Sequence, residues 1–196
     1  MGMILYHGSS QIVDRPDTEH SRIDIDFGKG FYLTADERMA KKWAAGKGKA
    51  IVNKYNLDID KINGYKFSLN EEWLDFIKSN RLMEPTDKYD QYDILIGPTA
   101  DDKLYDTLRE YLDGTMTAKE AIKTLNVLGY SNQIVITKQS TLDHLHFLGA
   151  KELSGQELQD YRNRIRDDRR MASEKTLELK KRFVLERKQR ELNDER

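Results

Sequence analysis

The start of the chain combines a histidine and a glycine in a way that can serve a ligand. His7, Gly8 and Ser9 follow an apolar run at the N-terminus. A histidine at a strand end offers an imidazole to a ligand, and the glycine after it leaves the backbone unshielded. The same histidine can also be a structural residue that hydrogen-bonds its neighbours. The segment is a candidate binding site whose role depends on what else the fold brings there.

A second segment, "DFGKGFYLT" at residues 26–34, places two glycines around a lysine and follows them with two aromatic residues. Glycine permits close backbone approach and weakens a strand, so Gly30 marks either a tight turn or the passage of a ligand. Tyr32 ends this segment, and Trp43 lies two to three turns along the helix expected after it. If that helix folds back over the strand, the two rings flank a slot for a flat ligand ring, each stacking contact contributing about 0.5–1.5 kcal/mol. The alternative is that both rings belong to the core.

Two other polar residues stand at positions where a ligand could reach them. Gln133 opens a strongly apolar strand, and Arg22 precedes the glycine turn. Arg22 is a candidate phosphate ligand, or else a solvated surface residue. His144 and His146 have the spacing of metal ligands on a strand, but no carboxylate or cysteine pattern supports them. We therefore expect no metal site.

The elements that position these residues must come from a chain of 196 residues, enough for one well-cored domain and an appendage. The net charge of −1 gives no general reason to expect nucleic acid or a membrane as partner. The sequence has no cysteine, no apolar run as long as a membrane span, and an N-terminus too mixed for a signal peptide. We expect a soluble, cytoplasmic protein.

Short apolar runs and helical patterns alternate up to residue 154, which predicts an α+β domain over residues 1–154. Strands are expected at 4–7, 30–33, 50–57, 92–98 and 133–137, and helices at 70–80, 100–112 and 117–126. Thr34 and Glu37 have the spacing of a capping box, which predicts a helix from there to about Ala45. Gly46 and Gly48 would end it.

Residues 155–196 form a second unit, a charged C-terminal extension. Beyond Gly155 they contain neither glycine nor proline and consist mostly of strong helix formers, so one long helix is expected from about Gln156. Its apolar stripe is interrupted at Asp168 and Thr176, which is too irregular for a coiled coil. We favour a solvated helix that docks its first turns on the domain over a partner-binding arm.

Considered together, "LYHGS", "DFGKGFYLT", an aromatic residue eleven positions after Tyr32 and a polar residue opening a late strand resemble the ADP-ribosyltransferase superfamily. The resemblance is to the branch with a His–Tyr–Glu triad, which includes diphtheria toxin and the poly(ADP-ribose) polymerases. "FGKGFYLTAD" is similar to the polymerases' Phe-Gly-Lys-Gly-Ile-Tyr-Phe-Ala-Asp. Residues 3–153, including "GPTADD" at 97–102, also resemble a bacterial family of unknown function placed in this fold. The resemblance implies split antiparallel β-sheets with surrounding helices.

The resemblance implies NAD as a substrate and gives the first candidates roles at its nicotinamide end. His7 would hydrogen-bond a ribose hydroxyl. The Gly8 backbone would pair with the nicotinamide carboxamide, with Ser9 beside it in the same motif. Tyr32 and Trp43 would hold the nicotinamide ring between them.

The remaining roles include two departures from the family pattern. Arg22 would lie toward the pyrophosphate or adenosine, and Gly30 would let the strand pass close to the dinucleotide. Ala40 replaces a serine that holds the carboxamide in the polymerases, and Gln133 replaces the catalytic glutamate. A glutamine can accept a hydrogen bond from a ribose hydroxyl, but it cannot stabilise positive charge as a carboxylate does or act as a general base. By analogy with a lost oxyanion-hole donor, this would slow the reaction about 10²–10³-fold.

The resemblance thus implies an NAD-dependent mono-ADP-ribosyltransferase, a glycosyltransferase that releases nicotinamide and modifies a protein or nucleic-acid acceptor. Elongation of poly(ADP-ribose) is not expected. By family analogy, such a bacterial enzyme would be a toxin, of a toxin–antitoxin pair or of phage defence, with an antitoxin bound through the C-terminal helix. Two alternatives stay open, a catalytically silent NAD- or ADP-ribose-binding module and an RNA-modifying enzyme.

Overall fold

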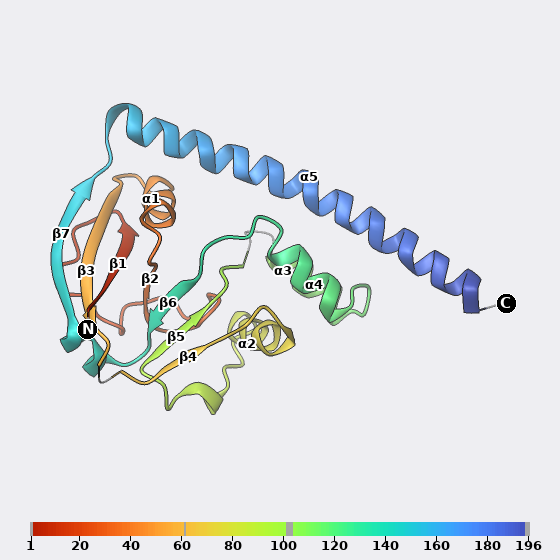
Figure 1. Cartoon of the computed structure of the whole chain (residues 1–196), viewed down its shortest axis with the longest axis horizontal. Helices are drawn as coiled ribbons and strands as arrows, with labels where there is room; N and C mark the ends of the chain where they lie inside the picture. Colours follow the sequence, from red (N-terminus) through yellow and green to blue (C-terminus); the bar gives the residue numbers. More distant parts are fainter. Residues whose placement is uncertain (1, 61, 101–103, 195–196) are drawn as a thin grey trace.

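The computed structural model describes residues 2–60, 62–100 and 104–194 and shows a mixed α+β architecture. Two β-sheets face each other, shorter helices cover their outer sides, and one long helix crosses the whole molecule (Figure 1). The predicted α+β class and the long C-terminal helix are confirmed. The end of the "GPTADD" run falls on residues 101–103, outside the described residues.

The first sheet has three antiparallel strands in the order β1-β3-β7. They are β1 (Gly2–Ser9), β3 (Ile51–Asp58) and β7 (Leu145–Glu152). The patterns of β1 and β3 predict them as strands, whereas β7 was not expected. β7 pairs with β3 along its length, but most of its side chains are exposed or half-buried. Its sequence therefore lacks the clear apolar alternation that would predict a strand.

The second sheet has four strands in the order β2-β6-β5-β4. They are β2 (Phe31–Leu33), β6 (Gln133–Ile136), β5 (Ile94–Gly97) and β4 (Gly64–Lys66). The β4–β5 pair is parallel and the other pairs are antiparallel. β4 was also missed, because its three residues are exposed or half-buried and too few to show a period.

The shorter helices are α1 (Glu37–Ala45), α2 (Glu71–Arg81), α3 (Leu104–Leu112) and α4 (Ala118–Leu125), with 3-10 turns η1 (Asp87–Tyr89) and η2 (Gln139–His144). The capping box expected at Thr34 is wrong, since the N-cap of α1 is Asp36, whose carboxylate accepts from the Arg38 N–H. Thr34 instead donates its hydroxyl to the Asn132 carbonyl at 3.1 Å and pairs its backbone with Tyr6.

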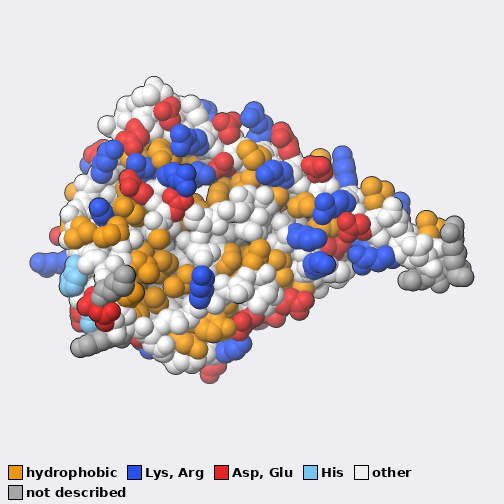
Figure 2. Space-filling model, viewed as in Figure 1, with side chains coloured by type: hydrophobic (Ala, Val, Ile, Leu, Met, Phe, Trp, Pro, Cys, Tyr) orange, Lys and Arg blue, Asp and Glu red, His pale blue; other side chains and the backbone are white. Residues whose placement is uncertain are grey.

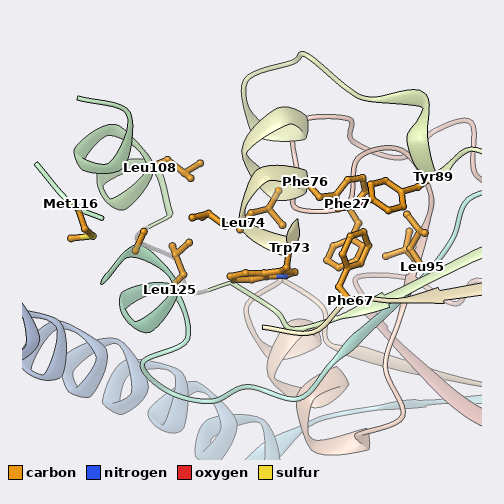
Figure 3. Close-up of a cluster of buried hydrophobic side chains, with 13 residues drawn as sticks. Phe27, Phe67, Trp73, Leu74, Phe76, Tyr89, Leu95, Leu108, Met116 and Leu125 are labelled. Atoms are coloured by element: carbon orange, nitrogen blue, oxygen red, sulfur yellow. The ribbon is translucent and has the colours of Figure 1, made fainter. Parts of the chain in front are cut away.

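Three clusters of buried side chains define a layered core. The first lies between the four-stranded sheet and helices α2, α3 and α4 and contains the aromatic group of Figure 3. The second fills the space between the two sheets, and the third lies between the three-stranded sheet, α1 and the start of α5. The order is therefore helix, sheet, sheet, helix. The four-stranded sheet lies between two clusters, whereas the outer face of the three-stranded sheet is covered only in part, since Lys54 and Leu148 are exposed.

The long helix α5 (Gly155–Asp194) docks along much more than its first turns. Tyr161, Ala172, Thr176 and Phe183 are all buried, and Phe183 is 1% exposed. Asp168, which interrupts the apolar stripe, forms an ion pair with Lys42 of α1 at 2.5 Å. The expectation of a helix held only by its first turns is wrong, because polar residues also form part of its contact face.

Candidate functional site

His7 lies near the end of β1, and its ring packs on the Phe31 ring. The two ring centroids are 4.6 Å apart. Its Nδ1 is 2.7 Å from the main-chain oxygen of Tyr32. A carbonyl oxygen only accepts, so Nδ1 carries the proton and Nε2 of the neutral ring is an acceptor. Burial lowers the pKa of His7 and outweighs the hydrogen bond to the Tyr32 carbonyl, which favours the neutral ring. His7 therefore offers Nε2 to a hydroxyl donor.

Gly8 and Ser9 are tied into the packing around the end of β1. A Cβ atom built on Gly8 would lie 2.1 Å from the carbonyl oxygen of Ala40, so a side chain here would push α1 away from the sheet. The Ser9 hydroxyl donates to the Gln11 carbonyl at 2.5 Å and accepts from Asn53 Nδ2 at 3.2 Å. The structure thus gives Gly8 a packing role and Ser9 a role in holding the following loop.

Tyr32 holds the glycine turn through its hydroxyl. The phenol donates to the Gly28 carbonyl at 2.8 Å and accepts from the Phe27 N–H at 3.0 Å. Burial raises the pKa of Tyr32 well above its usual value, and the charge of nearby Asp26 raises it further. Tyr32 is therefore a neutral phenol whose hydroxyl bonds to the turn backbone.

Gly30 lies where the turn meets the neighbouring strand. A Cβ atom here would lie 2.5 Å from Val135 Cγ1 of β6, closer than real contacts allow. The Gly30 N–H donates to the Ser21 hydroxyl at 2.9 Å. Of the two roles that the sequence left open for this glycine, the turn packed on a buried strand has direct structural support.

Trp43 lines a pocket of about 200 Å³ between α1, the segment after β5 and α5. A second pocket of about 380 Å³ shares Lys42, Tyr130 and Asp168 with it, so the two adjoin. Ligand pockets commonly measure several hundred Å³, the range of the second pocket, whereas the first is smaller. Figure 2 shows charged side chains of both signs interspersed along the upper edge, where α5 lies.

Gln133 is the first residue of β6 and is 3% exposed. Its Nε2 lies 3.2 Å from Asp26 Oδ2 and 3.4 Å from the Pro98 carbonyl oxygen. Asp26 also accepts from the Ala100 N–H at 3.3 Å, and Ala100 lines the Trp43 pocket. Sequence reasoning did not single out Asp26, although it opens the "DFGKGFYLT" segment.

The fold brings most of the candidates together, but in two groups. His7 lies against the Tyr32 backbone. Tyr32 pairs with Val135, two residues from Gln133, so Tyr32 and Gln133 point to the same face of the sheet. Trp43 packs beside Gly8. Among the described residues, its pocket connects to Gln133 through Ala100 and Asp26 and through Thr99 and Pro98.

Arg22 stands apart from these groups. Its exposed guanidinium donates from Nε and Nη2 to Asp24, at 3.0 and 2.9 Å. It is not among the described residues that line the pocket beside Trp43. A phosphate ligand at Arg22 would therefore have to compete with this carboxylate.

The described part of the chain was also compared with the requirements of a metal site and of a membrane span. Within it, no three His, Asp or Glu side chains come together as a metal site requires. None of its helices is both long and apolar enough to cross a membrane.

The chain is thus a mixed α+β protein with two facing sheets and a histidine, a tyrosine and a glutamine on adjoining strands. It belongs to the DUF3990 family, described as "Protein of unknown function", whose family model matches residues 3–147. The match includes every candidate residue above and ends within β7, so α5 follows it. Comparison with curated proteins gives no match.

Proposed function

We propose that the chain is an NAD-dependent mono-ADP-ribosyltransferase with an ADP-ribosyltransferase-like fold. The observation that carries this proposal is the placement of His7, whose ring bonds to the backbone of Tyr32, with Gln133 on the same sheet face as the tyrosine. These residues follow the order of the His–Tyr–Glu branch.

The chemistry needs acceptors for ribose hydroxyls and a surface for a flat ring. The neutral His7 ring provides Nε2 as an acceptor, the amide of Gln133 provides Oε1, and Trp43 provides an aromatic wall. In the reaction, the bond between ribose C1′ and nicotinamide breaks, and its electron pair leaves with nicotinamide. A lone pair of the acceptor forms the new bond to C1′, and the acceptor loses a proton.

The test measures nicotinamide release and transfer of label from NAD that carries its label in the adenylate part. The protein is incubated with cell lysate, and samples are then digested separately with protease and with nuclease to identify the acceptor class. We expect His7→Asn to abolish release and His146→Asn, an exposed histidine on β7, to leave it unchanged. Equal release by the wild type and His7→Asn would overturn the proposal.

A second candidate is a silent NAD- or ADP-ribose-binding module, favoured by the absence of a carboxylate at Gln133. This alternative predicts NAD binding by titration calorimetry with no nicotinamide released and no label transferred.

The toxin role is part of the same proposal and rests on family resemblance. Expression of the wild type in a bacterial host should arrest growth, and expression of His7→Asn should not. An antitoxin that binds α5 would restore growth without changing the NAD-binding residues. Growth that is the same with either form would argue against a toxin.

A further inference from the structure

Asp26 lies at the centre of a buried polar network that ends at Gln133. Asp26 is 6% exposed, and its Oδ1 forms an ion pair with Arg81 of α2, at 2.5 Å from Nη2 and 3.0 Å from Nε. Its Oδ2 faces Gln133 Nε2 at 3.2 Å. Asn80 Nδ2 also donates to the Asp26 carbonyl at 3.0 Å, so α2 holds both the side chain and the backbone of this residue.

The partners of Gln133 determine which way its amide points. Asp26 Oδ2 and the Pro98 carbonyl are both acceptors, so the amide nitrogen must face them. No hydrogen-bond donor to Oε1 is found among the described residues. Oε1 therefore points away from Asp26 and Pro98, and an amide oxygen can accept a hydrogen bond from a ligand hydroxyl.

The same geometry accounts for glutamine at a position where the resembled family has glutamate. A carboxylate at residue 133 would lie about 3 Å from Asp26, and the pair would share one guanidinium. Two carboxylates so close cannot both ionise readily. An amide avoids this conflict and donates a hydrogen bond to Asp26.

We propose that Asp26, held by Arg81, is a positioning residue that orients the Gln133 amide, and that the carboxylate of this site lies in the glycine turn instead of on β6. The inference rests on the proposed function. It predicts that the two residues are exchangeable only as a pair. Asp26→Asn together with Gln133→Glu would keep one carboxylate, one amide and a hydrogen bond between them, with Arg81 then bonded to an amide oxygen instead of a carboxylate.

The kinetic test compares NAD hydrolysis by Asp26→Asn, Gln133→Glu and the double variant. We expect each single variant to lower kcat about 10–100-fold, with the KM for NAD changed less than about threefold, because misorientation acts mainly in the transition state. The double variant should recover at least tenfold over the weaker single variant. The matched control is Asp75→Asn, an exposed acid of α2, which should behave as wild type. A double variant no better than either single variant would overturn the inference.

A second measurement separates this inference from the proposed function. The side-chain amide protons of Gln133, assigned by their loss in Gln133→Glu, should exchange slowly in the NMR spectrum of the free protein, because the group is buried and bonded. Asp26→Asn should shift them and speed their exchange, whereas Asp75→Asn should not. If the wild type never turns over NAD, the proposed function fails. The NMR signals of Gln133 then still show whether Asp26 orients its amide. Signals unmoved by Asp26→Asn would refute it.

Discussion

Phe183 gives a direct test of how α5 is attached to the rest of the protein. It lies in the last third of α5, yet its side chain is 1% exposed. Phe183→Ala removes a fully buried ring, which loses about 1.5–3 kcal/mol of transfer free energy and leaves a cavity. Such substitutions in cores cost about 3–5 kcal/mol. We expect the free energy of unfolding to fall by about 3 kcal/mol, a large part of the roughly 5–15 kcal/mol typical of a folded protein.

The assay is urea unfolding followed by circular dichroism, with Leu185→Ala as the matched control. Leu185 lies on the same helix and is 59% exposed, so its truncation removes little buried surface. Both changes introduce alanine, which keeps differences in helix propensity small. We expect the control to stay within about 0.5 kcal/mol of the wild type. If Phe183→Ala is equally mild, α5 is not docked at this point and our account of its contact face is incorrect.

Two further predictions concern the candidate site. Burial lowers the pKa of His7 in the folded protein below its value near 6.5 in the unfolded chain. As the pH drops below about 6.5, the unfolded chain therefore binds a proton before the folded protein does. The free energy of unfolding should then fall by at most about 1.4 kcal/mol per pH unit. Urea unfolding at pH 7.5 and 5.5 should show this loss in wild type and His146→Asn but not in His7→Asn. Trp43→Ala should weaken nicotinamide binding by about 1–2 kcal/mol through lost stacking and burial, while Leu148→Ala, exposed on β7, should not. If titration gives the same nicotinamide affinity for Trp43→Ala and the wild type, Trp43 is not part of the binding site.

The fold was predictable where burial imposes a pattern on the sequence. β5 and β6 are buried on both faces or nearly so, and one face of β3 is buried along its whole length. Buried strand faces need mostly apolar residues. β7 was missed because it buries only Leu145 and part of Phe147, and its other side chains are mostly exposed, which leaves little pattern in the hydropathy. The length of α5 follows from composition, but its docking does not. In the sequence, Thr176 and Asp168 interrupt the apolar stripe of α5. In the structure, Thr176 is buried and Asp168 forms an ion pair on the contact face of the helix.

The candidate site was predictable to the extent that its residues follow one another along a few strands. His7 and Tyr32 were expected to lie together, and the structure joins the ring of one to the backbone of the other. Asp26 was not predicted, because its charge partner Arg81 lies 55 positions away in the sequence, on a helix whose end has no motif. Long-range ion pairs of this kind depend on packing that no local pattern records.

Asp26 changes the energetic meaning of Gln133. Considered without Asp26, an amide at residue 133 lowers the transition-state stabilisation relative to a carboxylate, since such charge stabilisation contributes about 3–4 kcal/mol. With Asp26 in place, a carboxylate at both positions would bring two negative charges to about 3.2 Å, the present separation of Nε2 and Oδ2. At an effective dielectric constant of about 20, their repulsion is roughly 5 kcal/mol. Because Arg81 already pairs with Oδ1, it offsets this only in part. Before this offset the repulsion is at least as large as the catalytic gain, which favours a glutamine beside the carboxylate that we propose the glycine turn supplies.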